Sequence, residues 1–372
     1  MDGDRRPVRV AVIGADPTGR GFGARAHVPA VLATPGLELV AVCTAHPETA
    51  EAASRLWGVP KQFFDYEVLM ADRDIDLVTI AVRVRLHRPI VEAAIEAGKM
   101  VYCEWPLCLS LQEAAPLAAL ASSRRATAGV GLQGRFAPGV RFAKELIDRG
   151  DIGRPLSFLA SHLLSKFDVQ SDRWWLSMEE EGSGAFQVAT AHTTDTIQYL
   201  LGDVIELSGV KAILSPRGRF SDTGGWFQWT ASDTVGYLVR LAGGCLGAGF
   251  VTNTSVPPMG FTLRIIGEEG QLAVSAPGYV SFSKASVLLG RAGDEHLREV
   301  PVPHTFFRDL SLGENDPGLN VAFALQELVR SSAGREPFHP NLSDAVRLHG
   351  ILDAIAASSE EGRWCKVGSE PA

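Results

Sequence analysis

The first third of the chain alternates between short apolar runs and longer amphipathic stretches. The runs are almost continuously apolar, as expected for strands that are covered on both faces of a parallel sheet. They lie at residues 8–14, 37–43, 76–82, 100–104 and 127–132, and the stretches between them have helical spacing. One such stretch, PIVEAAIEA, is followed by Gly98, a residue type that commonly ends helices. This alternation predicts a doubly wound parallel sheet of the Rossmann type.

The pattern changes after about residue 130. A helical stretch at 137–150 and a long strand-like segment at 154–167 come first, and another helix is predicted at 183–201. From 204 to 302 short strands alternate with turns such as LAGG and GEEGQ, which is typical of antiparallel hairpins. We therefore expect an α/β protein with a Rossmann domain at 6–130 and an α+β domain at 131–372, the latter built on a large, mostly antiparallel, open sheet.

Composition and charge narrow the classes of partner. The formal net charge is −8 and the pI about 5.6, which argues against direct binding to nucleic acid or to an anionic membrane. No apolar run reaches the ~18 residues of a membrane span, and the first residues, MDGDRRP, lack an apolar signal core. The five cysteines form no CxxC pair, which indicates reduced thiols and a cytoplasmic location. Because an open sheet face is usually covered by another protein chain, we expect a homodimer or homotetramer.

A glycine-rich turn follows the first predicted strand, in VIGADPTGRGFG. The spacing GxGxxG would need glycine at 14, 16 and 19, and the middle position is Asp16, whose charge near a pyrophosphate is unfavourable unless the side chain turns outward. Further glycines at 21 and 23 allow a longer loop, and the next helix offers its N-terminus to an anion. The sequence predicts a dinucleotide site formed by Gly14, Asp16, Thr18, Gly19, Arg20, Gly21 and Phe22; the alternative is a glycine-rich turn without a ligand.

The second predicted strand ends without the carboxylate that usually binds the ribose 2′-hydroxyl of NAD. Thr44 and His46 stand there instead, and both side chains can hydrogen-bond a 2′-phosphate. This favours NADP over NAD as the cofactor. The alternative is that these residues only cap the helix that begins at Pro47.

Five segments, read in order, resemble the GFO/IDH/MocA family, the group of glucose–fructose oxidoreductase and inositol dehydrogenase. The resemblance covers nearly the whole chain and is carried by AAIEAGKMVYCEWPL, RGDIGRPLSF, GSGAFQVATAHTTD, RIIGEEGQLAVS and DAVRLHGILDAI. It implies an NAD(P)-dependent enzyme that acts on a small molecule. No metal is expected.

The family's Glu-Lys-Pro motif maps onto Glu104, Trp105 and Pro106, so a tryptophan replaces the lysine that contacts the reacting oxygen. The family's Asp-x-x-x-His maps onto Val188 and His192, so the aspartate is also missing. Glu-Trp occurs in the galactose-regulon repressors of fungi, which bind NAD(P) as a signal and turn nothing over. Trp105 therefore marks either a sensor or a stacking platform for an apolar substrate beside the nicotinamide.

Other candidates complete the expected site. His192 is the expected general acid or base, since an imidazole exchanges protons near neutral pH, and Trp105 and Lys166 are its expected companions. The alternative for Lys166 is a solvated surface residue without a chemical role, and the alternative for Arg83 is a structural salt bridge. The remaining expected residues are Arg83, His87, Glu104, Trp105 and Pro106 at the cofactor, and Trp174, Trp175, Phe186, His192 and Asp195 at the substrate.

Three functions are compatible with these features. The first is an NAD(P)-dependent oxidoreductase for a ketone, alcohol or imine of a bulky, partly apolar molecule. The second is a non-catalytic NAD(P) sensor that acts through a protein partner. The third is a lyase or epimerase that uses bound NAD transiently.

Overall fold

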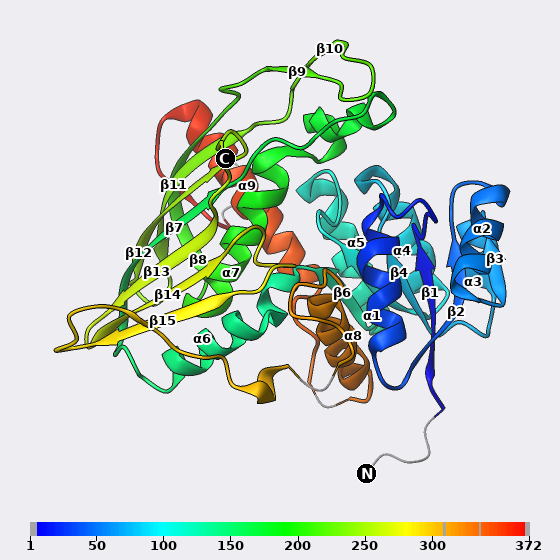
Figure 1. Cartoon of the computed structure of the whole chain (residues 1–372), viewed down its shortest axis with the longest axis horizontal. Helices are drawn as coiled ribbons and strands as arrows, with labels where there is room; N and C mark the ends of the chain where they lie inside the picture. The colour runs from blue at the N-terminus through cyan, green and yellow to red at the C-terminus, as the bar shows by residue number, and fades with distance from the viewer. Residues whose placement is uncertain (1–5, 308–309, 335, 369–372) are drawn as a thin grey trace. The chain divides into compact units, whose positions relative to one another are not determined.

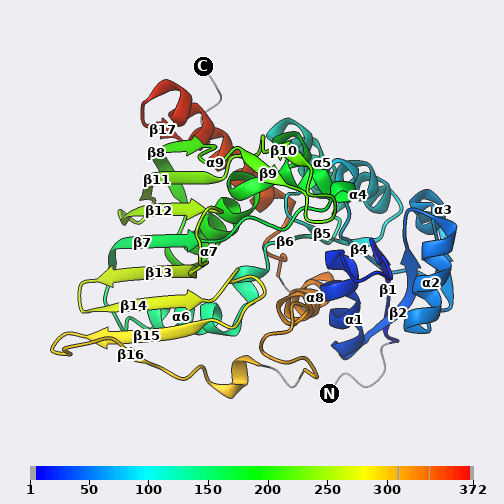
Figure 2. The ribbon, with the colours of Figure 1, turned by 45° about the horizontal axis from the view of Figure 1, so that its top comes forward.

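A computed structural model describes residues 6–307, 310–334 and 336–368 (Figure 1). These residues form two compact units. The first extends to Gln133 and takes in a later segment ending at Val346, and the second comprises the rest. The later segment contains α8 (Leu319–Ser332), which packs beside α1 (Val28–Ala33) within the first unit (Figures 1 and 2). The sequence placed this helix in the range 131–372, because an apolar helix face does not indicate which unit it covers.

The first unit is built on six parallel strands in the order β3-β2-β1-β4-β5-β6. This order belongs to the Rossmann fold and confirms the predicted doubly wound sheet. The short β3 and α3 were not predicted, since three and six residues carry too little periodicity. The strands are β1 (Val8–Ile13), β2 (Leu37–Cys43), β3 (Lys61–Phe63), β4 (Leu77–Ile80), β5 (Met100–Glu104) and β6 (Ala128–Gly131); the helices besides α1 and α8 are α2 (Pro47–Trp57), α3 (Tyr66–Ala71), α4 (His87–Glu96) and α5 (Leu111–Arg124).

Local signals in the sequence explain where these helices begin and end. Gly98 lies just beyond α4 with φ of 70°, in the left-handed region, as predicted for a residue that ends a helix. The hydroxyl of Ser110 accepts the N–H of Glu113 at the start of α5, and the Glu113 carboxylate accepts the N–H of Leu109. The turn after β5 is therefore held in place by a cap at its helical end.

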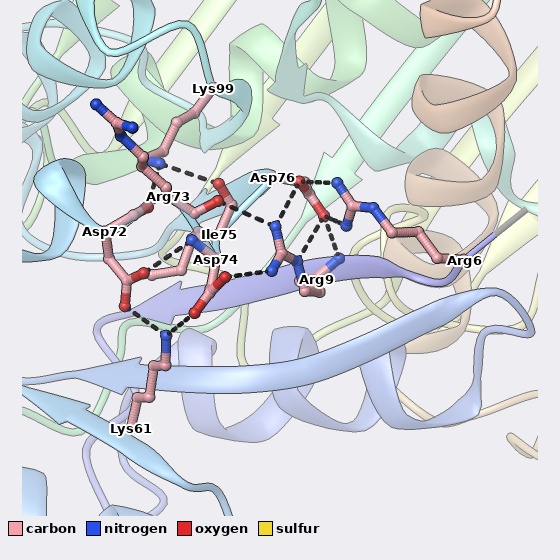
Figure 3. A network of polar contacts seen from close by, with 9 residues as sticks. All are labelled: Arg6, Arg9, Lys61, Asp72, Arg73, Asp74, Ile75, Asp76 and Lys99. Carbon is pink, nitrogen blue, oxygen red and sulfur yellow. Dashed lines mark hydrogen bonds and ion pairs between the residues drawn. The ribbon is translucent and has the colours of Figure 1, made fainter.

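A network of charged groups ties the amino ends of β1 and β4 together (Figure 3). The Asp76 carboxylate accepts hydrogen bonds from Arg6 at 2.7 and 3.0 Å and from the backbone N–H of Arg9 at 2.9 Å. The buried Lys99 ammonium donates to the carbonyl oxygens of Asp72 and Ile75 at 2.7 and 2.9 Å. This edge of the sheet is thus closed by structural contacts.

The second unit is built on nine strands in the order β16-β15-β14-β13-β7-β12-β11-β8-β17 (Figure 2). Only β7 and β12 pair in parallel within this sheet, so the predicted large, mostly antiparallel sheet is confirmed. The predicted turns at 241–244 and 267–271 join β11 to β12 and β13 to β14. The strands are β7 (Pro155–Leu163), β8 (Val204–Ala212), β11 (Thr234–Leu241), β12 (Leu246–Thr252), β13 (Gly260–Gly267), β14 (Gly270–Ala276), β15 (Ser286–Arg291), β16 (Arg298–Glu299) and β17 (Cys365–Lys366), with β9 (Arg217–Arg219) and β10 (Trp226–Gln228) as a separate hairpin.

The two faces of this sheet differ in character. Helices α6 (Pro138–Asp148) and α7 (Ala191–Leu201) pack on one face, and strand residues such as Phe158 and Val239 are buried there. Leu159 and Leu238 point to the other face and are exposed, and both lie beside the same residue of β12, Ala248. The remaining helix, α9 (Leu342–Glu361), begins in the first unit and continues into the second. Short helical turns lie at Val84–Leu86, Gln133–Phe136, Ser171–Ser177, Glu179–Glu181 and His304–Phe306.

Candidate active site

The glycine-rich turn at the carboxyl end of β1 has a backbone that only glycine can supply. Gly14 has φ of 96°, and a Cβ on it would lie 2.2 Å from the carbonyl oxygen of Ala81. A Cβ on Gly23 would lie 2.5 Å from the carbonyl oxygen of Gly14. Gly23 begins a π-helical turn, η1 (Gly23–His27), that continues into α1. The turn therefore packs strand and helix closely, as the binding of a pyrophosphate at a helix N-terminus requires.

The side chain of Asp16 is engaged by its own loop. Its carboxylate accepts the backbone N–H of Thr18 at 2.8 Å and also the Thr18 hydroxyl. Gly19 has φ of 71°, and a Cβ on it would have no neighbouring atom within 4 Å, so this part of the loop is open. The acid that replaces the middle glycine thus stabilises the turn. Arg20, Gly21 and Phe22 complete the loop before Gly23.

Thr44 and His46 lie at the carboxyl end of β2, where the sequence predicts the adenosine ribose. The Thr44 hydroxyl contacts the carbonyl oxygen of His46 at 3.1 Å and the hydroxyl of Thr49 at 2.7 Å. His46 occupies the N-cap position of α2, but its side chain makes no capping hydrogen bond and is exposed. Neither side chain caps α2 by the usual bond to a free N–H.

Glu104 ends β5 and lies in a buried polar cluster. Its Oε1 contacts His27 Nε2 at 2.8 Å, and Gln133 Nε2 donates to Oε1 and Oε2 at 2.6 and 2.8 Å. His27 lies at the end of η1, directly after the glycine-rich turn, and its ring is fully buried between Phe22 and Tyr102. The phosphate loop and the Glu104 turn are therefore connected by one short contact.

Trp105 and Pro106 follow Glu104, are joined by a cis peptide bond, and are buried. His87, at the start of α4, contacts the Pro106 carbonyl oxygen through Nδ1 at 2.7 Å and the Val82 carbonyl oxygen through Nε2 at 3.1 Å. Burial lowers the pKa of His87. His87 thus bridges the ends of β4 and β5, and it is a positioning group for the Trp105 turn. Arg83 is exposed and lies just before a short helical turn.

In the second unit, His192 lies in the first turn of α7, directly after a π-helical turn, η6 (Ala185–Thr190). It belongs to a cluster of buried rings. The Tyr279 ring lies 4.7 Å from the His162 ring and 6.1 Å from the His192 ring, edge-on to both. His162 Nδ1 contacts the hydroxyl of Thr193 at 3.0 Å. Burial, followed by the His162 charge, lowers the pKa of His192 to about 3, so its imidazole is neutral at physiological pH.

Lys166 lies just beyond β7, with its ammonium 4.6 Å from the centre of the Trp229 ring and 3.4 Å from the Asp233 carboxylate. It also donates to the carbonyl oxygen of Ser215. Burial lowers the pKa of Lys166, and Asp233 opposes that change. These contacts give Lys166 a structural role between β7 and β11.

The predicted substrate residues are not all alike. Asp195 is buried and receives Arg135 at both oxygens, with N–O distances of 2.6 and 3.0 Å, so it forms a structural ion pair. Phe186 is buried under the Lys211 ammonium, whose nitrogen lies 4.8 Å from the ring centre. Trp174 is exposed and Trp175 is half-buried. Trp174 and Trp175 thus remain accessible aromatic candidates.

The residues of these clusters that were not predicted include His27, Gln133, His162 and Tyr279. A histidine inside an apolar helix stretch, or a lone tyrosine near a hairpin, carries no signal of its own in one sequence. Gln133 directly follows the last predicted strand of the first unit. A polar residue at the carboxyl end of a parallel strand is a signal that could have identified it as a site residue.

Taken by itself, the first unit has the fold and the glycine turn of a dinucleotide-binding protein. The turn fits a pyrophosphate because its glycines leave space where any side chain would collide. Within the described ranges, no group of three or more His, Cys, Asp or Glu side chains is arranged to hold a metal ion. None of the helices described is long and apolar enough to cross a membrane.

Comparison with known proteins identifies the class. Residues 8–132 match the family model described as "Oxidoreductase family, NAD-binding Rossmann fold", and residues 140–273 match "GFO/IDH/MocA C-terminal domain". The chain is 30% identical to levoglucosan dehydrogenase of Pseudarthrobacter phenanthrenivorans, with 94% of this chain and 96% of that one covered. A structure of levoglucosan dehydrogenase with NADH and levoglucosan superposes with a TM-score of 0.84 at 25% identity, covering 98% of this chain and all of that one.

The chain belongs to the GFO/IDH/MocA family and is an NAD(P)-dependent oxidoreductase, as the sequence predicted. Its fold is also that of the super-repressor mutant of Gal80p from Saccharomyces cerevisiae, with a TM-score of 0.84 at 20% identity and 97% of this chain covered. At that identity the likeness concerns the fold alone.

Proposed function

We propose that the protein transfers a hydride between NAD(P) and a carbon that bears a hydroxyl, carbonyl or imine group in a ring-shaped, partly apolar small molecule. The nicotinamide cofactor carries the hydride. The observation that carries the proposal is the dinucleotide turn of the first unit, where Gly14 and Gly23 leave no room for a side chain. The sugar-like substrate of levoglucosan dehydrogenase and the accessible Trp174 and Trp175 support this substrate class.

His192 is the residue we assign to proton exchange. A neutral imidazole accepts the proton that leaves a substrate hydroxyl as the hydride departs. Lys166 is assigned no chemical step, because its ammonium is held by Asp233 and Trp229. Residues 6–130 would bind the cofactor, and 131–372 would bind the substrate and form oligomers.

His192→Gln tests the assignment. A general acid or base contributes roughly 10²–10⁴ in rate, so kcat should fall by that factor while NAD(P)H binding, measured by fluorescence titration, is unchanged. A screen of secondary alcohols and ring ketones identifies the substrate. Tight cofactor binding without turnover, in the wild type and the variant alike, would favour a sensor, the alternative that Trp105 in the lysine position supports.

For the dinucleotide we propose a preference for NADP. The carboxyl end of β2 carries no carboxylate, and the exposed His46 can contact a 2′-phosphate. His46→Glu should therefore weaken NADPH binding more than NADH binding. Equal affinities in the wild type would refute the preference.

We also propose a homodimer or homotetramer that buries the open face of the nine-stranded sheet. Leu159, Leu238 and Phe250 are exposed there, and an apolar sheet face of this kind rarely stays in water. Leu159→Glu should disrupt the oligomer and so lower the molar mass of the particles in solution, measured by light scattering. The five cysteines are buried free thiols, which supports a reducing, cytoplasmic location.

A further inference from the structure

Glu104 is a carboxylate bound by neutral donors. It accepts hydrogen bonds from the His27 ring and from the Gln133 amide, and its side chain is 13% exposed. Its described contacts include no lysine or arginine. The donors stabilise the carboxylate by hydrogen bonding, but they do not cancel its charge.

The neighbouring strand leaves space for this carboxylate. Gly131, at the end of β6, pairs with Glu104. A Cβ at Gly131 would lie 2.6 and 2.8 Å from the two carboxylate oxygens of Glu104. Any other residue at 131 would push the carboxylate away, so both strands fix its position.

The protonation of His27 decides the net charge of the cluster. Nε2 faces Glu104 and therefore carries the hydrogen of that contact. Nδ1 is buried and has no hydrogen-bond partner among the described residues. An imidazolium would leave an N–H unsatisfied at Nδ1, which is costly in a buried place. The neutral ring avoids this cost, so the cluster of His27, Gln133 and Glu104 keeps one net negative charge.

This charge lies at the half of the sheet that would hold the nicotinamide of a bound dinucleotide. Strands β4, β5 and β6 form the second mononucleotide-binding half of a Rossmann sheet, and Glu104 is at the carboxyl end of β5. The nicotinamide ring is cationic when oxidised and neutral when reduced. We propose that the Glu104 carboxylate, fixed by His27, Gln133 and Gly131, selects the oxidised form of the cofactor over the reduced form and so lowers the reduction potential of the bound cofactor.

The inference rests on the proposed cofactor site, and its test separates the two. Dissociation constants for the oxidised and reduced forms of NADP and NAD are measured by calorimetry and fluorescence for the full-length wild type, Glu104→Gln, Glu104→Asp and Glu96→Gln. Glu96 is an exposed carboxylate near the end of α4 and controls for general charge. The ratio of the dissociation constants of the oxidised and reduced forms is determined for each protein separately. A partial loss of folded protein affects both constants equally and leaves their ratio unchanged.

A unit charge about 10 Å away, at the effective dielectric constant of roughly 20 that applies near protein surfaces, changes a binding constant by on the order of tenfold. Glu104→Gln should therefore weaken the oxidised form relative to the reduced form by about tenfold, which raises the potential of the bound cofactor by about 30 mV. Glu104→Asp and Glu96→Gln should keep the wild-type ratio. Gln133→Lys, which places an ammonium beside Glu104, should shift the ratio in the same direction as Glu104→Gln and serves if that variant does not fold.

An unchanged ratio in Glu104→Gln, or an equal loss of affinity for both forms, would overturn the inference and leave the proposed function standing. Failure of the wild type to bind either form would overturn both.

Discussion

The buried pair of Arg135 and Asp195 gives the sharpest test of how the second unit is built. Asp195 was predicted to touch the substrate, whereas the structure places it on α7 with its carboxylate held by Arg135. The side chain of Asp195 is 3% exposed and that of Arg135 is 14% exposed. Asp195→Asn keeps the size of the side chain and removes the charge, so the nearly buried Arg135 loses the carboxylate that it contacts at both oxygens.

The expected loss of stability follows from that burial. Removing one partner of a fully buried pair costs about 3–5 kcal/mol, and the slight exposure of Arg135 places this pair at the lower end, about 3 kcal/mol. For a unit of roughly 200 residues, each kcal/mol shifts the melting temperature by about 2–4 °C. The second unit should therefore melt about 6–12 °C lower.

The assay is a thermal and urea unfolding series on the wild type, Asp195→Asn, Arg135→Met and the double variant Arg135→Met/Asp195→Leu. The double variant should recover much of the loss, because apolar side chains carry no desolvation penalty. Unchanged melting of Asp195→Asn combined with a raised KM would refute the structural assignment and restore the predicted substrate contact.

Three further predictions concern the first unit. Lys99→Met leaves the carbonyl oxygens of Asp72 and Ile75 without their buried donor and should cost about 3 kcal/mol in urea unfolding; a loss below about 0.5 kcal/mol would contradict this. Gly14→Ala forces a Cβ against Ala81 and should abolish NAD(P)H binding in a fluorescence titration. Gly21→Ala, whose Cβ would lie 3.6 Å from the Gly14 carbonyl oxygen, an ordinary contact, should retain most of the binding; equal behaviour of the two variants would argue against a packed turn. Burial raises the pKa of Asp76, but hydrogen bonds from Arg6 and Arg9 outweigh it and hold that pKa below its usual value. The stability that Asp76 contributes is therefore present above about pH 4 and is lost as the pH falls further. In Asp76→Asn, the melting temperature should fall less steeply with decreasing pH below about pH 4 than it does in the wild type.

Much of the fold was predictable because the strand-like and helix-like patterns of apolar residues along the chain are strong. Continuous apolar runs predicted the parallel strands of the first unit, and the LAGG and GEEGQ turns predicted two hairpins. The place of α8 was not predictable, since it depends on a long-range packing choice. The short β3 and β17 lack enough residues to show a period.

The candidate site was predictable where a residue has to be of one type. Gly14 requires a positive φ, and Glu104 is the last residue of a buried strand. The partners of these residues were not predictable, because His27 and Gln133 reach Glu104 from distant parts of the chain. Lys166 was predicted to belong to the site, but its ammonium is paired with Asp233. A single sequence does not reveal that ion pair.

The central claim is that the glycine turn after β1 and the carboxyl ends of β4 and β5 hold a nicotinamide dinucleotide. A crystal structure of the protein soaked with NADPH tests this most directly. The account predicts the pyrophosphate against Gly14 and the start of η1, with the nicotinamide beside Glu104 and Trp105. An empty turn, or one filled by the protein's own side chains at saturating NADPH, would contradict it.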